Sequence, residues 1–374
     1  MPHRRLTVLQ ILPALESGGT ERSVLDIAEG VVSAGHRSLV ISAGGQMVEQ
    51  LTNAGSEHIQ SGLGTKSPLT LRHVPWLRRF IREQKVDVID IQSRMPGWIA
   101  WLAWKSLPVA QRPAFISTMN GLHSPSLYSS IMCRGEHVIV VSNAMHKYVR
   151  SHYPFVPEDR LHVIYRGVDT EEFPRGFYPD HAWIKNFHQQ FPGAASRPVL
   201  TLAGRMTRLK GHADFLKLLV KLRERGVSAH GLIVGATDPR KVSYAAEIKA
   251  QVAELQLADQ ISLAGHRSDL KQIYAVSSIV LSLSSKPESF GLTVAEALSI
   301  GTPVVGYSHG GVAEILAAQF PLGAVEPGNV EELAERVAAI LAQEPRPVPS
   351  PVPFEKSVMQ QRTMDVYLAA VRGG

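Results

Sequence analysis

Short apolar segments alternate with amphipathic segments along most of the chain, and this alternation predicts strands separated by helices. In the first half of the chain, the expected strands are residues 6–12, 37–42, 86–92, 114–119, 137–142 and 161–165. The expected helices between them are residues 21–34, 70–84, 97–106 and 143–152. Because the apolar runs are nearly continuous and flanked by helices, we expect a parallel sheet that is covered on both faces.

The pattern is interrupted at residues 167–198, where Pro and Gly punctuate the chain and no clean period is present. We interpret this stretch as a connection between domains that includes a helix. A second series follows, with expected strands at 199–204, 230–235, 261–265, 279–284 and 303–307 and expected helices at 212–225, 243–256, 269–276, 293–300, 311–318, 330–342 and 355–371. The prediction is an α/β protein with two doubly wound, Rossmann-like domains. Ligands of such sheets bind beyond the carboxyl ends of the strands, so the loops there and the cleft between the domains are the expected site.

The length, composition and net charge of the chain agree with this organisation and restrict the range of possible binding partners only slightly. A chain of 374 residues favours two domains, and 44% hydrophobic with 19% charged residues is typical of an ordinary globular protein. The formal net charge of +6 suits an anionic partner, which a nucleotide phosphate, a membrane surface or a nucleic acid would supply. Cys133 is the single cysteine, so an intrachain disulfide and a cysteine-based zinc site are excluded, and a reducing compartment fits.

The amino-terminal segment resembles the start of a signal peptide, because Arg4 and Arg5 precede the apolar stretch LTVLQILPAL. However, Gln10 interrupts that stretch and no A-x-A site follows it, so a first buried strand explains it better. No segment approaches the ~20 apolar residues of a membrane-spanning helix. We therefore expect a cytoplasmic protein.

Two predicted strand-end loops carry groups suited to a phosphate. Gly18 and Gly19 follow the first strand, where the backbone can approach a ligand closely and the next helix offers free N–H groups to an anion. An ordinary turn is the alternative, and the pair is not the G-x-G-x-x-G of a standard dinucleotide site. Arg205, Arg208 and Lys210 gather after the first strand of the second series. Arg205 can bind phosphate oxygens bidentately and Lys210 adds a point charge, although a solvated basic loop is equally consistent.

Two acids stand in the stretch KPESFGLTVAEAL, residues 286–298. Thr293 and Glu296 fit a capping box, in which Thr293 caps the helix and Glu296 reaches back to the Thr293 N–H. Glu288 has no such structural explanation. A helix start attracts anions, so a glutamate beside a helix start is better suited to binding neutral hydroxyls than cations. A carboxylate is also a good acceptor of the two hydrogen bonds that a diol can donate. A sugar and a ribose both present diols.

Two more strand-end loops belong to the second series. Gly310 and Gly311 form a further glycine pair before a helix, and His266 and Arg267 end another strand. Ser268 or Asp269 is expected to cap the next helix, and no further role is expected of Asp269. The sequence contains no HExxH and no H-x-E with C-x-x-C, so zinc-dependent hydrolases are not favoured.

In combination, these motifs resemble the family 4 glycosyltransferases of the GT-B fold, and the resemblance runs through nearly the whole chain. It rests on Glu288 and Glu296 eight residues apart, the Gly-Arg…Lys-Gly of 204–211, the pairs Gly18-Gly19 and Gly310-Gly311, and the stretch VIYRGVDTEEF at 163–173. The stretches LPALESGGTER, QSRMPGW and PESFG further resemble bacterial enzymes of lipopolysaccharide core assembly.

The resemblance implies transfer of a hexose from a nucleotide diphosphate sugar to a glycan or lipid-linked acceptor. It implies retention at the anomeric carbon, no cofactor and no divalent metal. Because a donor phosphate oxygen is thought to take the acceptor's proton in many members, no side-chain nucleophile is required. The implied domains are residues 1–171 with a C-terminal helix within 355–374 returning to them, for the acceptor, and residues 172–354, for the donor.

The same resemblance assigns roles to individual residues. Arg205 and Lys210 hold the diphosphate and stabilise the departing charge. Glu288 binds donor sugar hydroxyls, and Glu296 binds the ribose. The other expected donor contacts are Gly18, Gly19, Gly204, His266, Arg267, Ser289, Phe290, Gly291 and Leu292.

The sequence departs from the family pattern at one position. Members often carry a histidine two residues after a strand-end threonine, here Thr118, and Asn120 occupies that place. Asn120 can hydrogen-bond a sugar hydroxyl but cannot titrate, and we expect it among the catalytic residues. His123 is a possible substitute, with a surface or packing role as the alternative. Arg94 and His123 are the expected acceptor contacts.

Segment 66–85 combines basic residues with Trp76 and Phe80, which lie four apart on one helical face, and WIAWLAW at 98–104 adds tryptophans. A basic helix with interfacial aromatic residues suits the anionic inner face of a membrane, and an ordinary helix packed on the sheet is the alternative.

Two other functions compete with glycosyl transfer: a GT-B epimerase and a non-catalytic nucleotide-sugar-binding subunit. Nucleic acid is not an expected partner, because the basic residues do not belong to a known binding module.

Overall fold

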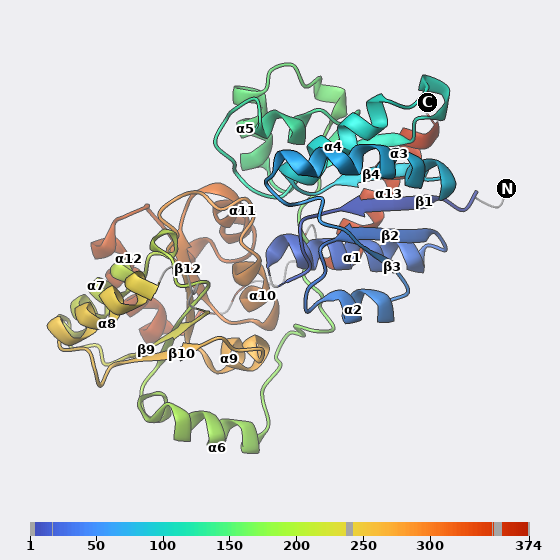
Figure 1. The fold of residues 1–374 in the computed structure, drawn as a ribbon. Helices are drawn as coiled ribbons and strands as arrows, with labels where there is room; N and C mark the ends of the chain where they lie inside the picture. The colour runs from blue at the N-terminus through green and yellow to red at the C-terminus, as the bar shows by residue number, and fades with distance from the viewer. Residues whose placement is uncertain (1–3, 17, 237–241, 346, 348–353, 373–374) are drawn as a thin grey trace. The chain divides into compact units, whose positions relative to one another are not determined.

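The computed structural model describes residues 4–16, 18–236, 242–345, 347 and 354–372. The chain divides into two compact units (Figure 1). Unit 1 comprises Met1–Gly167 and Pro353–Gly374, and unit 2 comprises Val168–Val352. Each unit is built around its own parallel sheet, and each is described separately below.

Unit 1 contains a parallel sheet with the strand order β3-β2-β1-β4-β5-β6-β7. Its strands are β1 (Thr7–Ile11), β2 (Arg37–Ser42), β3 (Glu57–Gln60), β4 (Val88–Ile91), β5 (Ala114–Met119), β6 (His137–Val140) and β7 (Leu161–Val163). Its α-helices are α1 (Gly19–Ser33), α2 (Val48–Asn53), α3 (His73–Glu83), α4 (Arg94–Lys105), α5 (Asn143–His152) and α13 (Lys356–Arg372). The central strands are buried on both faces, which explains the nearly continuous apolar runs.

Helices cover both faces of the unit 1 sheet. On one face, α1 and α13 pack side by side over Val8 and Val88, and Tyr367 of α13 is completely buried there. On the other face, α4 packs closely, because a Cβ added at Gly97 would lie 2.8 Å from the Ile91 side chain. The expected return of the C-terminal helix to the first domain is therefore confirmed.

Unit 2 contains a parallel sheet with the strand order β10-β9-β8-β11-β12-β13. Its strands are β8 (Val199–Ala203), β9 (His230–Val234), β10 (Ile261–Gly265), β11 (Ile279–Ser282), β12 (Val304–Tyr307) and β13 (Ala324–Val325). Its α-helices are α6 (His181–Gln190), α7 (His212–Glu224), α8 (Val242–Glu254), α9 (Leu270–Val276), α10 (Leu292–Ile300), α11 (Gly310–Gln319) and α12 (Val330–Gln343). In both sheets the strand order reverses direction beside the first strand, as in doubly wound folds.

Three elements escaped the sequence pattern, namely α2, β3 and β13. Strand β3 has the sequence EHIQ at the edge of its sheet, with exposed ends, so it shows no apolar run. Strand β13 is only two residues long. Within the described residues, no helix combines the length and the apolar content that crossing a membrane requires.

Candidate functional site

The loops after β8 and β11 are joined at the carboxyl edge of the unit 2 sheet. The Ser285 N–H donates to the Leu209 carbonyl oxygen at 2.8 Å. Gly211, which begins α7 with a φ of +74°, lies so close that an added Cβ would collide with the Leu283 carbonyl. Glycine is required at that position by both conformation and space. The two loops therefore present their side chains to one another.

Lys210 and Glu288 meet at this junction, although they are far apart in the sequence. The Lys210 Nζ donates to Glu288 Oε1 at 2.6 Å, and the Ser284 hydroxyl donates to the same oxygen. The side chains of Lys210 and Glu288 are 28% and 20% exposed, so a ligand can reach both. The Lys210 stem lies over Gly204, where an added Cβ would stand 3.2 Å from its Cδ and Cε atoms.

The Glu288 carboxylate is held ionised by its surroundings. Burial raises its pKa, but the Lys210 ammonium, the Ser284 hydroxyl and the His309 ring together hold the pKa below its ordinary value. His309 is fixed beside the pair, because its Nε2 lies 2.8 Å from the Ser284 carbonyl oxygen. The site thus holds one positive and one negative charge in contact, each able to exchange its partner for a group of the ligand.

The second glycine pair holds the Glu288 loop against α11. Glu288 and Gly310 form a parallel bridge, and the Gly311 N–H donates to the Glu288 carbonyl at 2.9 Å. An added Cβ at Gly310, whose φ is +59°, would strike the Glu288 carbonyl, and one at Gly311 would strike the Phe290 backbone. These glycines allow the contact that places Glu288.

The three basic residues of the 202–212 loop have three different surroundings. Lys210 binds Glu288, whereas Arg208 turns to α8, where it forms two hydrogen bonds with Glu247 and lies 5.0 Å from the Tyr244 ring centre. Arg205 is exposed, and no hydrogen bond or ion pair of its side chain occurs among the described residues. Arg205 is therefore the member of the loop whose guanidinium is available.

The expected capping box at the start of α10 is wrong. The helix begins at Leu292 with Gly291 as its N-cap, and Gly291 has a φ of +114°. Thr293 is therefore already inside the helix, and no side chain caps it. Glu296 Oε2 instead lies 3.4 Å from the hydroxyl of the buried Tyr274. The structure therefore removes the capping explanation for Glu296.

The start of α10 offers backbone donors at the same edge. Ser289 and Leu292 are partly buried, whereas the Phe290 side chain is only 2% exposed and packs inward. Helix starts carry N–H groups without intrahelical acceptors, which favours an anionic or hydroxyl ligand. The expected donor contacts at residues 289–292 stay a prediction.

His266 and Arg267 follow β10 at the same edge of the sheet, but their side chains differ in whether other residues of the protein bind them. His266 is exposed. Arg267 binds both carboxylate oxygens of Asp269, at 2.8 and 2.5 Å, and donates to Gln190 Oε1 at 2.8 Å. Asp269 also accepts from the Trp183 Nε1 and makes no side-chain cap bond, so the expected capping role of Asp269 is wrong.

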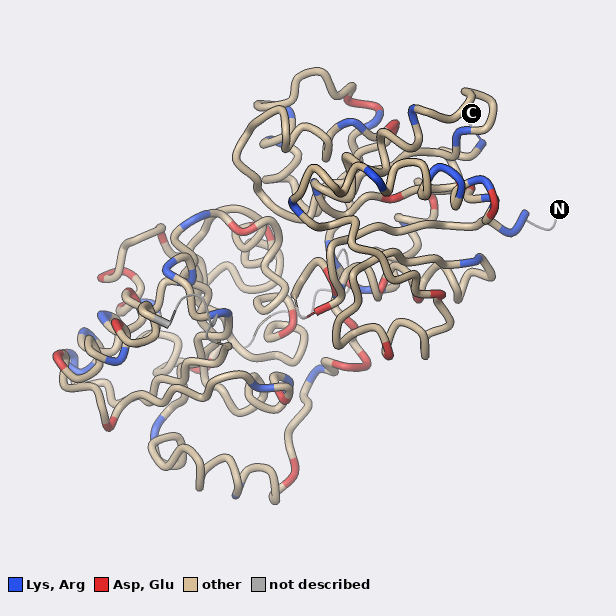
Figure 2. The backbone as a smooth tube through the Cα atoms, viewed as in Figure 1, with Lys and Arg blue, Asp and Glu red and all other residues tan. Residues whose placement is uncertain are grey.

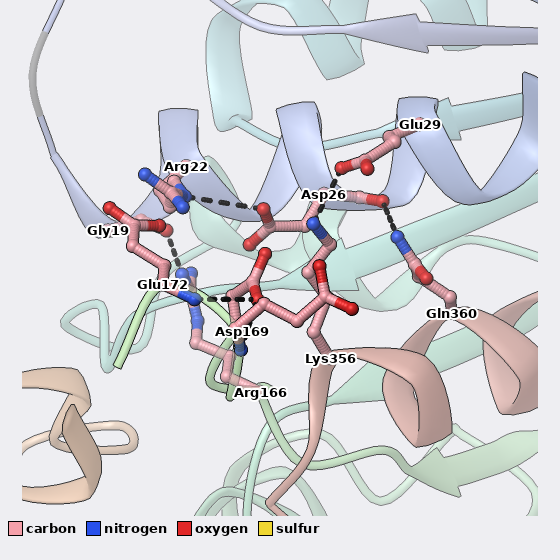
Figure 3. A network of polar contacts seen from close by, with 10 residues as sticks. Gly19, Arg22, Asp26, Glu29, Arg166, Asp169, Glu172, Lys356 and Gln360 are labelled. Atoms are coloured by element: carbon pink, nitrogen blue, oxygen red, sulfur yellow. Dashed lines mark hydrogen bonds and ion pairs between the residues drawn. The ribbon is translucent and has the colours of Figure 1, made fainter. Parts of the chain in front are cut away.

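At the carboxyl edge of the unit 1 sheet, a buried chain of hydrogen bonds ends at the first glycine pair. Gly18 is the N-cap of α1, and the Gly19 carbonyl accepts from Arg166 Nη1 (Figure 3). Arg166 Nη2 donates to Asn120 Oδ1 at 2.9 Å, and Asn120 Nδ2 donates to Gln92 Oε1 at 2.6 Å. Asn120 is 9% exposed, and both polar atoms of its amide are engaged.

The chain continues to a completely buried aspartate. Gln92 Nε2 donates to Asp90 Oδ2 at 2.7 Å, and the hydroxyls of Thr118 and Tyr367 donate to Asp90 at 2.8 and 2.6 Å. Burial raises the pKa of Asp90 to about 7, although these donors lower it. Tyr367 belongs to α13, so the C-terminal helix is tied to the strand ends of this site.

The expected acceptor residues, Arg94 and His123, are brought together. Burial, followed by the charge of Arg94, lowers the pKa of His123 to about 4, so its ring is neutral near pH 7. Arg94 Nη1 donates to the Ser129 Oγ at 3.2 Å and lies 5.1 Å from the Tyr128 ring centre. A neutral imidazole and a guanidinium thus share one loop region of unit 1.

Among the residues of these clusters that sequence reasoning missed are Gln92, Arg166 and Ser284. Each follows a strand of the structure by one to three residues. A search for polar residues at every strand end would have selected them, because those ends meet at one edge of a sheet.

The comparisons with known proteins agree for both units. The family model described as Glycosyltransferase Family 4 matches residues 17–172, and the one described as Glycosyl transferases group 1 matches residues 184–350. An uncharacterised glycosyltransferase of Methanocaldococcus jannaschii is 25% identical over 94% of this chain and 90% of its own length. A lipopolysaccharide core mannosyltransferase, LpcC of Rhizobium leguminosarum bv. viciae, is 27% identical over 40% of this chain and 42% of its own.

Two solved structures share the fold throughout. A glycosyltransferase of Rickettsia africae superposes with a TM-score of 0.86 at 25% identity, covering 100% of both chains. Anabaena HepE, solved in complex with UDP and glucose, has a TM-score of 0.78 at 20% identity, covering 97% of this chain and 99% of its own. The expected GT-B fold is confirmed. From its two sheets, its strand-end loops and these matches, the chain is a glycosyltransferase and belongs to family 4.

Proposed function

We propose that this glycosyltransferase moves a hexose from a nucleotide diphosphate sugar to a glycan or glycolipid acceptor, with retention of the anomeric configuration and without a divalent metal. The observation that carries the proposal is the contact between Lys210 and Glu288, with the available guanidinium of Arg205 in the same loop. A cation for the leaving diphosphate and a carboxylate for sugar hydroxyls are thereby in one place.

The proposed chemistry needs no side-chain nucleophile. The bond between the anomeric carbon and the phosphate oxygen breaks while the acceptor oxygen bonds to the same face of that carbon. The acceptor's proton passes to the departing phosphate oxygen. Lys210 and Arg205 stabilise the negative charge that develops on the diphosphate, which is electrostatic catalysis at a leaving group. Glu288 orients the sugar by accepting hydrogen bonds from its hydroxyls.

A nucleotide panel is the direct test of the donor class. We expect UDP, GDP or ADP, or a hexose linked to one of them, to raise the unfolding temperature of the protein. A ligand at 100 times its Kd stabilises by about 2.7 kcal/mol, which is enough to rank the three bases. UDP is the first candidate, because Anabaena HepE was solved with it. No shift with any of the three would contradict the proposed donor.

Product analysis tests the remaining parts of the reaction. NMR of the product should show the anomeric configuration of the donor, and transfer should survive EDTA. An inverted product would overturn retention, and activity that is lost in EDTA and restored by magnesium would overturn metal independence. Transfer to a lipopolysaccharide core acceptor is the first acceptor to try, because one relative is named for that step.

We further propose that unit 1 docks on an anionic membrane surface through helix α3 and the 3-10 helix η1 (Pro68–Arg72). Leu69, Leu71 and Trp76 are 72%, 53% and 37% exposed. The basic residues among and around them are Lys66, Arg72, Arg78, Arg79, Arg82 and Lys85, and all of these are exposed. Figure 2 marks the positions of Lys and Arg along the backbone in blue. Apolar side chains between cations are the arrangement that an anionic interface binds.

Vesicle co-sedimentation tests this surface. Wild-type protein should sediment with vesicles containing phosphatidylglycerol and stay in solution with pure phosphatidylcholine. The double variant L69S/W76A should lose most of the binding, whereas L322S, which changes an exposed leucine of unit 2, should bind like the wild type. Equal sedimentation of the wild type and L69S/W76A would refute the surface.

A further inference from the structure

Arg166 is a buried cation held by neutral oxygens. Its side chain belongs to a residue that is 6% exposed, and its two hydrogen bonds go to the Gly19 carbonyl and to Asn120 Oδ1. Burial lowers the pKa of Arg166 to about 10, while Asp26 and Glu21 act on it only through their charge. A guanidinium in such a place costs free energy that a neutral residue would not, so its retention calls for a role.

The geometry shows which part of the protein Arg166 controls. The Gly19 carbonyl is in the first turn of α1, next to the exposed N-cap Gly18, and an added Cβ at Gly19 would stand 3.4 Å from Arg166 Nη1. A planar guanidinium donates in fixed directions, so one pair of bonds sets the distance between this turn and the end of β5. Among the residues that the structure describes, no side chain caps this turn.

Asn120 determines how the guanidinium is oriented. Its Oδ1 accepts from Arg166 while its Nδ2 donates to Gln92, and one amide supplies both groups. Gln92 is anchored in turn to Asp90. Since the acceptor is neutral, it fixes Arg166 without cancelling its charge.

We propose that Arg166 is a positioning residue for the donor, which sets the Gly18–Gly19 turn, and that Asn120 acts through Arg166 rather than on the substrate. The proposal rests on the proposed function and on the expectation that Gly18 and Gly19 contact the donor. It replaces the expectation that Asn120 is a catalytic residue.

A double-mutant cycle on kcat/KM for the donor tests the proposal. The variants are R166Q, N120L and R166Q/N120L. Each single change should lower kcat/KM for the donor by roughly 10- to 100-fold through misplacement of the turn, with the acceptor KM unchanged. If Asn120 acts through Arg166, the double variant should be no worse than the poorer single variant. Fold losses that multiply would show that Asn120 acts independently, and would overturn the proposal.

Two controls separate this role from a structural one. N120D keeps an acceptor for Arg166, so it should recover most of the kcat/KM that N120L loses; failure to recover with an unchanged unfolding midpoint would also overturn the proposal. W104F removes the hydrogen bond from the buried Trp104 Nε1 to the Pro113 carbonyl oxygen, outside this chain of residues, so it should lower the unfolding midpoint and leave kcat/KM for the donor unchanged. If R166Q does not fold, R166K replaces it in the cycle. A wild-type protein inactive with UDP-, GDP- and ADP-linked hexoses would instead contradict the proposed function.

Discussion

At the scale of single residues, the partner of a side chain decides its role more than its type or its place in the sequence. Arg205, Arg208 and Lys210 stand within six residues, yet Arg208 is bound to Glu247, Lys210 to Glu288, and Arg205 is exposed. A basic loop of this kind does not act as a uniform patch of charge. The two residues proposed to bind diphosphate can be separated from the third by experiment.

Replacing Arg205 or Lys210 with alanine should lower kcat by about 10²- to 10³-fold, because a charge that develops in the transition state loses one donor. Replacing Arg208 with alanine is the matched control from the same loop, and its kcat should stay close to that of the wild type. The measurement is steady-state transfer at saturating donor. Wild-type rates in R205A and K210A, or an equally large loss in R208A, would contradict the assignment.

At the scale of elements, both edges are held by contacts between strand ends and helices. In unit 2, Gly310 and Gly311 bring α11 against the Glu288 loop. In unit 1, Asp90 at the end of β4 accepts from Tyr367 of α13, so a helix from the end of the chain supports the loops near Asn120. The acceptor in this second contact is a buried carboxyl group whose pKa is raised by burial.

The raised pKa of Asp90 has a consequence for stability against pH. Its ordinary pKa is near 3.8 and burial raises it to about 7, so folding favours the protonated form. Its contribution to the free energy of unfolding is therefore complete below the unfolded pKa and is lost as the pH rises through about 7. The urea midpoint of the wild type should fall, relative to that of D90N, between about pH 4 and about pH 7 and stay level above that. A difference between the two proteins that does not change with pH would contradict this account.

At the scale of the whole molecule, unit 1 is assembled from two distant parts of the chain. Its core includes Met359, Met364, Val366 and Tyr367 of α13 beside Leu6, Val8 and Ile27. Polar contacts add to this packing, since Lys356 pairs with Glu29 at 2.7 Å and Gln360 donates to the Asp26 carbonyl at 2.6 Å (Figure 3). Unit 2 is continuous in sequence between these parts.

A fragment of residues 1–167 should therefore not fold by itself. Each fully buried apolar side chain contributes about 1.5–3 kcal/mol, so the loss of the four from α13 is comparable to the whole net stability of a domain, about 5–15 kcal/mol. The same fragment joined to residues 353–374 by a flexible linker should recover a cooperative urea transition, measured by circular dichroism. A cooperative transition of the fragment without α13 would refute the prediction.

Much of the fold was predictable because parallel strands buried on both faces leave continuous apolar runs, as in IVLSLS before the Glu288 loop. Edge strands such as β3 leave no such record. The positions and residue types of the candidate site residues were predictable, because these residues lie in the loops at strand ends. Their partners were not: a T-x-x-E pattern predicted a cap at Thr293, but the positive φ of Gly291 begins α10 earlier.

The sequence by itself determined the two α/β units, the positions of the strand-end loops and the residue types that those loops carry. These properties are local, because they follow from periodicity, glycine conformation and side-chain chemistry along the chain. Only the tertiary structure decided that Lys210 meets Glu288, that Arg208 does not face them, and that Asn120 holds Arg166. Those pairings depend on contacts between residues dozens of positions apart, which are set by how strands and helices pack and leave no period in the sequence.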